Sequence, residues 1–250
     1  MQKRFDGKVV IVTGAGSGIG RACALRLGQE GGHVFACDVD RDALADFEGE
    51  ARSAGFRIDT HVLDVADADA CRRAVESAVA TCGRLDVLCN IAGISKLDHL
   101  ANFTDELWNR MLAINLSSVF FLSQAAMPHL LASRGNIVNM ASSAGLEGQA
   151  YNAIYCATKA GVVMLSKSMA MEFSGRGVRV NAVCPGGVVT PLLRATRMPD
   201  GADPALFGRL MPLVPLAQAE EIATAVAYLA SDEARYVTGI AFSIDGGQTI

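Results

Sequence analysis

Tyr155 and Lys159 stand four residues apart in the segment Y-C-A-T-K, so a helix would place both side chains on one face. A free tyrosine has a pKa near ~10 and is a poor base at neutral pH, but a neighbouring ammonium favours the phenolate and lowers that pKa. A tyrosine tuned in this way can take a proton from an alcohol or give one to a carbonyl oxygen. Ser142 follows the apolar run G-N-I-V-N-M-A, which is typical of a buried strand, and its hydroxyl could hydrogen-bond the same oxygen.

A Y-x-x-x-K pair alone is more often an exposed tyrosine beside a solvated lysine, so the chemistry depends on a hydride carrier elsewhere in the chain. The β-branched run 8–13 predicts a buried strand, and it leads into G-A-G-S-G-I-G at 14–20 and a helix over 21–30. Strand, glycine turn and helix together present backbone N–H groups and a helix dipole to a phosphate. The spacing is G-x-x-x-G-x-G, with Ile19 in the last glycine place of the more common G-x-G-x-x-G. A purely structural turn remains the alternative.

Asp38 follows at the end of a second predicted strand, 33–38, and lies 18 residues after Gly20. An acid at this place can hydrogen-bond an adenosine ribose. It could also cap the helix that begins near Arg41, and both roles are compatible.

The remaining pattern alternates strands with helices. Strands are predicted over 57–63, 85–89, 135–141, 177–183 and 236–244, and helices over 67–82, 104–133, 155–174 and 220–229. This order predicts an α/β protein: a single-domain, Rossmann-like doubly wound fold over 1–250, with a parallel sheet of about seven strands and helices on both faces. Ligands in such folds bind at the C-terminal ends of the strands, where the candidate polar residues and glycines converge.

Composition argues against several other classes. A formal charge of −4 provides no basic field for nucleic acid, and no fully apolar run approaches the ~18 residues of a membrane span. The N-terminal segment is not a signal peptide. Seven scattered cysteines without a C-x-x-C indicate reduced thiols in a cytoplasm, and the four scattered histidines suggest no metal site.

The segment 190–216 differs in composition from the rest of the chain, because five of the seven prolines lie between 191 and 215 among apolar residues. A proline-punctuated, apolar insertion of this length is more often a lid or binding loop than a passive connector. We therefore expect a substrate lid here.

Taken together, these motifs closely resemble the classical short-chain dehydrogenase/reductase family almost from end to end. The resemblance rests on Thr13-Gly14-x-x-x-Gly18-Ile19-Gly20, Asp64-Val65, Asn90-x-Ala92-Gly93, Asn115, Ser142, Tyr155-x-x-x-Lys159, Pro185-Gly186 and Asp245-Gly246-Gly247. Ile91 departs from the family, which often has a second asparagine there, but backbone contacts should survive the change.

The resemblance implies a role for each matched residue. Tyr155 would be the general acid/base, Lys159 would lower its pKa and bind the nicotinamide ribose, Ser142 would orient the substrate oxygen, and Asn115 would hold a proton-relay water. The implied cofactor-binding residues are Gly14, Ser17, Gly18, Ile19, Gly20, Asp38, Asp64, Val65, Asn90, Ala92, Gly93, Tyr155, Lys159, Pro185, Gly186, Val188 and Thr190. Residues expected to face the substrate are Ser95, Lys96, Ser142, Ala144, Glu147, Gln149, Asn152 and Gly187.

The favoured interpretation is an NAD-dependent oxidoreductase of secondary alcohols and ketones. NADPH-dependent members commonly carry arginine or lysine in the glycine loop or after the second strand, whereas this chain has Ser17 and Asp38. Arg41 is the nearby cation, and we expect it to shield the adenine or pair with Asp38. An NADPH-dependent 3-oxoacyl reductase is the alternative, and a non-catalytic cofactor sensor is a third. The resemblance also implies a homotetramer and a small-molecule substrate whose identity the sequence leaves open.

Overall fold

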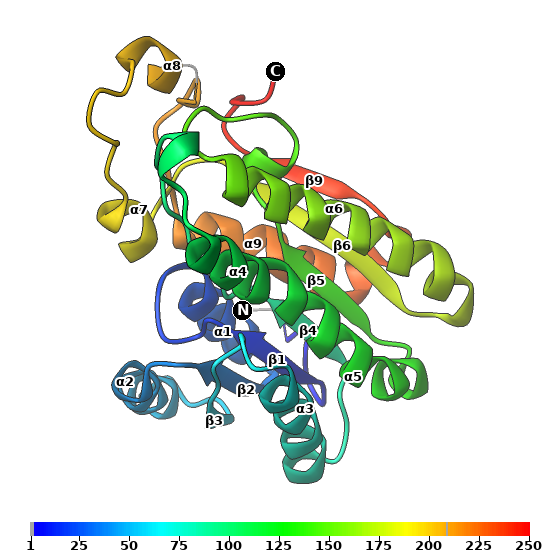
Figure 1. Cartoon of the computed structure of the whole chain (residues 1–250). Coiled ribbons are helices and arrows are strands. Elements are labelled where there is room, and N and C mark those ends of the chain that lie inside the picture. The colour runs from blue at the N-terminus through cyan, green and yellow to red at the C-terminus, as the bar shows by residue number, and fades with distance from the viewer. Residues whose placement is uncertain (1–2, 209) are drawn as a thin grey trace.

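The computed structural model describes residues 3–208 and 210–250 and contains a seven-stranded sheet in the order β3-β2-β1-β4-β5-β6-β9 (Figure 1). Every neighbouring pair in this sheet is parallel. The strands are β1 (Val9–Thr13), β2 (His33–Asp38), β3 (Ile58–Val62), β4 (Val87–Asn90), β5 (Asn136–Met140), β6 (Arg179–Pro185) and β9 (Ala241–Ile244). The order reverses between β1 and β4, so the predicted doubly wound fold is confirmed.

Helices cover both faces of the sheet, because the central strands are apolar on both sides. One face packs against α1 (Gly18–Gln29), α2 (Arg41–Ser53) and α9 (Ala219–Ala230). The other packs against α3 (Ala68–Cys82), α5 (Ser118–Ser133) and α6 (Ala153–Phe173), with α4 (Asp105–Leu112) leading into α5. Short 3₁₀ turns lie at Leu100–Asn102, Ser143–Gly145, Ser174–Arg176 and Asp232–Ala234. These layers hold the C-terminal ends of the strands at one edge.

Two predicted elements differ from the structure by more than a shift of one to three residues at an end. The helix expected over 104–133 is interrupted by a π-helical turn, Ala113–Ser117, which the amphipathic pattern does not reveal. The strand expected over 236–244 starts only at Ala241, because Tyr236 is almost fully exposed and Gly239 takes a left-handed φ of 74°. Residues before that glycine therefore turn away from the sheet.

The helical stretch Asp105–Ser133 is long and apolar enough to pass a composition test for crossing a membrane. Half of its most apolar window is buried inside the fold, where Met111 and Leu122 pack in the core. Burial of this kind accounts for the apolar composition without a bilayer.

The segment 190–216 projects beyond the body of the molecule and carries α7 (Pro191–Ala195) and α8 (Pro204–Gly208) (Figure 1). Residue 209 lies outside the described part of the chain. The base of the segment is closed by a small parallel pair, β7 (Val188–Val189) with β8 (Ala217–Gln218). Two hydrogen bonds connect the outer part of the segment 190–216 to the body of the protein. The Asp203 N–H donates to Tyr151 Oη at 2.8 Å, and His99 Nε2 donates to the Asp200 carbonyl at 2.9 Å.

Candidate active site

A cavity of about 700 Å³ opens at the C-terminal edge of the sheet, where the loops after β1, β2, β4, β5 and β6 meet. Nearly all of the sequence-predicted cofactor residues line it, Asn90 being the exception. The lining residues among these are Gly14, Ser17, Gly18, Ile19, Gly20, Asp38, Asp64, Val65, Ala92, Gly93, Tyr155, Lys159, Pro185, Gly186, Val188 and Thr190. The fold therefore brings to one place residues that lie far apart in the sequence.

The glycine loop fits a phosphate group by its backbone geometry. A Cβ at Gly20 would lie 2.0 Å from the Gly14 carbonyl oxygen, and Gly18 adopts a left-handed φ of 52°. Ser17 is the N-cap of α1, but its side chain makes no capping hydrogen bond within the described residues. The first N–H groups of α1 thus remain available at a cavity wall, together with the positive end of the helix dipole.

Asp38 is held in a fixed orientation at the cavity wall. Its Oδ2 accepts the Gly16 N–H at 2.8 Å, and its Oδ1 accepts the Asp40 N–H at 3.0 Å. Asp40 in turn caps α2 through the Asp42 and Ala43 N–H groups. Arg41 is exposed and does not line the cavity, and among the described lining residues the basic ones are Arg110 and Lys159.

Lys159 and Tyr155 lie on one face of α6, as predicted, with Nζ 5.5 Å from the centroid of the phenol ring. Lys159 is buried and donates to the Met140 carbonyl at 2.7 Å. Burial lowers the pKa of Lys159 to about 8. Burial also raises the pKa of Tyr155 to about 12, partly offset by a hydrogen bond from Ser142.

The expected lowering of the Tyr155 pKa is therefore wrong, because the pKa is raised. Burial of the ring disfavours the charged phenolate, and this desolvation is the largest cause of the raised pKa of Tyr155. At neutral pH the site holds a phenol and an ammonium, and the phenol is the form that donates a proton.

Ser142 stands just after β5, and its Oγ accepts the Ala144 N–H at 3.2 Å. Among the predicted substrate residues, Ser142, Ser95, Gln149, Asn152 and Gly187 line the cavity. The other predicted substrate residues do not line the cavity: Ala144 is buried, Glu147 accepts a hydrogen bond from Gln248 at 3.2 Å, and Lys96 is exposed.

Asn115 lies in the π-helical turn and is fully buried, outside the cavity lining. Its Oδ1 accepts the Ile94 N–H at 2.9 Å, while its Nδ2 donates to the Ile94 carbonyl at 2.9 Å. Nδ2 also lies 3.3 Å from Thr158 Oγ1. The side chain therefore fixes the loop after β4 against α6, close to Lys159.

Asn90 is likewise structural in its contacts, because its buried amide donates to Asn139 Oδ1 at 2.8 Å and joins β4 to β5. Thr13 supports the same loop, since its Oγ1 accepts the N–H groups of Ile91 and Ala92 at 2.9 and 3.1 Å. In the sequence, the only sign of this supporting role is that Thr13 places a hydroxyl at the end of the first predicted strand.

Some lining residues were missed because they belong to no motif. Val39, which is 63% exposed, follows Asp38 and adds apolar surface beside it. Arg110 reaches the cavity from α4, and Leu97 reaches it from the loop after β4. The segment 190–216 and the C-terminal segment add Leu192, Leu193, Met198, Met211 and Gln248.

Comparison with known proteins identifies the class. The family model described as enoyl-(acyl carrier protein) reductase matches residues 14–249. The chain belongs to the classical short-chain dehydrogenase/reductase family and is a short-chain oxidoreductase of CH–OH groups that uses a nicotinamide cofactor.

Particular relatives span the whole chain. It is 40% identical to the 3-oxoacyl-[acyl-carrier-protein] reductase FabG of Thermotoga maritima, over 99% of this chain and 100% of the relative. It is 41% identical to the D-threitol dehydrogenase of Mycolicibacterium smegmatis, covering 99% and 95% of the two chains. The crystal structure of a short-chain dehydrogenase from Mycobacterium paratuberculosis bound to NAD superposes with a TM-score of 0.92 at 31% identity, covering 98% and 99% of the chains.

Proposed function

We propose that the protein is an NAD-dependent dehydrogenase of secondary alcohols, which also reduces the corresponding ketones. The observation that carries the proposal is the Asp38 carboxylate, held by two backbone N–H groups at the cavity wall where an adenosine ribose would lie. A carboxylate there accepts hydrogen bonds from a ribose diol and repels a 2′-phosphate. The NAD bound to the superposed relative supports the same choice.

The binding residues act through backbone and charge. In this proposal, the glycine loop 14–20 holds the pyrophosphate, Asp64 and Val65 border the adenine, and Lys159 contacts the nicotinamide ribose. Ala92, Gly93, Pro185, Gly186, Val188 and Thr190 close the walls around the nicotinamide. The bound nicotinamide supplies the hydride transfer.

The protein's own side chains transfer one proton. Ser142 hydrogen-bonds the substrate oxygen and orients it toward Tyr155. In reduction, the phenol of Tyr155 gives its proton to that oxygen, and in oxidation the phenolate takes it back. Lys159 stabilises the phenolate, because an ammonium about one helical turn away lowers the free energy of that negative charge.

The substrate end of the cavity is mostly apolar. Lid residues 192, 193, 198 and 211 line it together with Leu97, whereas Gln149 and Asn152 supply polar groups next to Tyr155. This lining favours a small secondary alcohol with an apolar body and a limited number of further polar groups. The lid over 190–216 would exclude water during transfer.

A second candidate is an NADPH-dependent 3-oxoacyl reductase, which the 40% identity to such an enzyme favours. The two candidates differ in the cofactor that they use. Steady-state turnover of a panel of secondary alcohols, diols, ketones and 3-oxoacyl thioesters with NAD(H) and NADP(H) tests them. We expect kcat/KM to favour NAD by at least ~10²-fold. Equal use of both cofactors, or fastest turnover of a 3-oxoacyl thioester with NADPH, would favour the second candidate.

We also propose a homotetramer in a reducing cytoplasm. Phe120 on α5 and Met164 and Met171 on α6 are 43%, 63% and 90% exposed, and β9 forms an edge of the sheet. Burial of these side chains between copies would remove exposed apolar surface. All seven cysteines are free, which supports a reducing compartment.

A further inference from the structure

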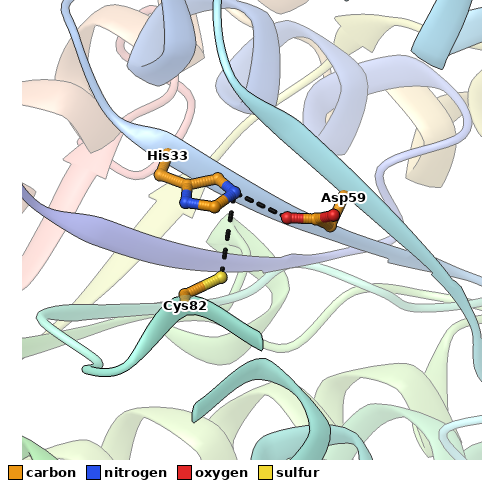
Figure 2. Close-up of side chains that lie close together, drawn as sticks. All are labelled: His33, Asp59 and Cys82. Atoms are coloured by element: carbon orange, nitrogen blue, oxygen red, sulfur yellow. Dashed lines mark hydrogen bonds and ion pairs between the residues drawn. The ribbon is translucent and has the colours of Figure 1, made fainter. Parts of the chain in front are cut away.

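His33, Asp59 and Cys82 come together at the end of the sheet opposite the cavity, although 26 and 23 residues separate them in sequence. His33 is the first residue of β2, Asp59 lies in the edge strand β3, and Cys82 is the last residue of α3. Figure 2 shows the three side chains pointing toward one another from these elements. None of them lines the active-site cavity, and Asp38 lies five residues along β2, roughly 16 Å away.

The contacts converge on a single nitrogen. His33 Nε2 lies 2.6 Å from Asp59 Oδ2 and 3.8 Å from Cys82 Sγ. In a thiol–imidazole–carboxylate relay, the acid and the thiol bond opposite ring nitrogens. Here both face Nε2, so the cluster is not built to activate the thiol, and burial, with Asp59 nearby, raises the pKa of Cys82.

A cation between the three donors fits this geometry better. Tetrahedral zinc with ordinary Zn–N and Zn–S bonds sets its nitrogen and sulfur ligands about 3.6 Å apart, close to the observed 3.8 Å. A nitrogen and an oxygen ligand would stand about 3.4 Å apart, so Asp59 would have to move outward by about 0.8 Å from His33. Asp59 has room for this movement because its side chain is 40% exposed, whereas that of His33 is 11% exposed.

Local charge also favours a cation. Cys82 ends α3, so the carbonyl end of a 15-residue helix dipole points at the cluster. A thiolate and a carboxylate would balance the two positive charges of the ion. Arg57 is a nearby cation that acts against binding, but it is exposed and screened by solvent.

We propose that His33, Asp59 and Cys82 form a binding site for one borderline-soft divalent cation, with zinc the best match to a thiolate, imidazole and carboxylate set. Water would complete the fourth position from the solvent-facing side. The ion would tie the edge strand β3 to β2 and α3, so its role would be structural and separate from hydride transfer.

The test uses the full chain, reduced and free of any histidine tag. Zinc is titrated against a chromophoric chelator, and cobalt is added in place of zinc to look for a thiolate charge-transfer band. The variants are Cys82→Ser and Asp59→Asn, and the matched control is His61→Gln, which removes a nearby histidine of the same region that is not in the cluster.

The wild type and His61→Gln should bind one equivalent of zinc and show the cobalt–thiolate band. Cys82→Ser should lose the band, and both cluster variants should bind zinc at least about tenfold more weakly. Zinc should raise the thermal midpoint of the wild type and not that of Cys82→Ser. Circular dichroism confirms that each variant is folded, and Asp59→Asn carries the test alone if Cys82→Ser does not fold.

Three results would overturn the proposal. The first is a wild type that binds no stoichiometric zinc, and the second is cluster variants that bind it as tightly as the wild type. The third is a loss of binding in His61→Gln equal to that in the cluster variants.

Discussion

Replacing Asp38 with asparagine tests the basis of cofactor choice. The change removes the charge and keeps an oxygen that can accept the Gly16 N–H, which Asp38 now binds at 2.8 Å. Two unit negative charges at ~4–5 Å repel by about 1 kcal/mol in bulk water and by about 4 kcal/mol at an effective dielectric near 20. The expected ~10²-fold preference for NAD corresponds to about 2.7 kcal/mol and lies within this range.

The Asp38→Asn variant should use NAD less well and NADP better. A hydrogen bond to a charged acceptor contributes about 1.5–3 kcal/mol, and an amide does not keep that strength for both ribose hydroxyls. We therefore expect the ratio of kcat/KM for NAD to that for NADP to fall by at least about tenfold, measured with one alcohol at saturation.

Asp40→Asn is the matched control, because it makes the same charge change two residues away. Asp40 is the N-cap of α2 and does not line the cavity, and asparagine caps helices as well as aspartate. Its cofactor ratio and stability should stay near those of the wild type. A ratio within twofold of wild type in Asp38→Asn, or an equal shift in the control, would refute the role of Asp38.

The remaining predictions concern proton transfer by Tyr155, the buried charge of Lys159, the glycine loop and the proposed tetramer. Tyr155→Phe should lower turnover by at least ~10²-fold while NAD binding, followed by fluorescence, changes little; near-normal turnover would contradict the acid/base role. Lys159→Met should flatten the pH dependence of stability, because the pKa of Lys159 in the folded protein, about 8, lies below its ordinary 10.5, so the wild type gains stability as pH rises between these values. Chemical denaturation at several pH values measures this gain, and an identical rise in the variant would count against a buried ammonium. Gly20→Ala should weaken cofactor binding and lower stability by about 1–3 kcal/mol, since its Cβ would lie 2.0 Å from the Gly14 carbonyl, whereas Gly49→Ala in α2 has free space and should be neutral or slightly stabilising by thermal melting. Light scattering at micromolar concentration should give the mass of four chains, and a monomer would exclude the tetramer.

The fold and the centre of the site were accessible from sequence because they rest on local chemistry. Buried parallel strands appear as short β-branched runs, such as Val9–Thr13, and the glycine loop follows from backbone geometry that other residues cannot adopt. The C-terminal edge of a parallel sheet then collects whatever follows each strand, so Asp38 and Ser142 could be placed near the same cavity.

The failures have physical causes of another kind. The π-helical turn contains Asn115, whose side chain bonds the Ile94 backbone, and the periodicity of a sequence does not show such a tertiary contact. The Tyr155 pKa depends on how fully the ring is desolvated, which spacing along a helix does not show. The sequence pattern does not show the cluster of His33, Asp59 and Cys82, because these residues belong to three separate elements.

The two hydrogen bonds between the outer part of the proposed lid and the body would contribute to the free energy of opening it. Each neutral hydrogen bond contributes about 1 kcal/mol net, so releasing the contacts of Asp203 with Tyr151 and of His99 with Asp200 would cost about 2 kcal/mol. A free-energy difference of that size would by itself limit the open form to a few per cent of molecules. Tyr151, which accepts one of these hydrogen bonds, has a left-handed φ of 63° and lies four residues before Tyr155. The strained turn at Tyr151 therefore lies between this hydrogen bond and the start of α6. Ligand exchange would then draw on this minor population, whose size could be changed at His99 without touching the groups that perform the chemistry.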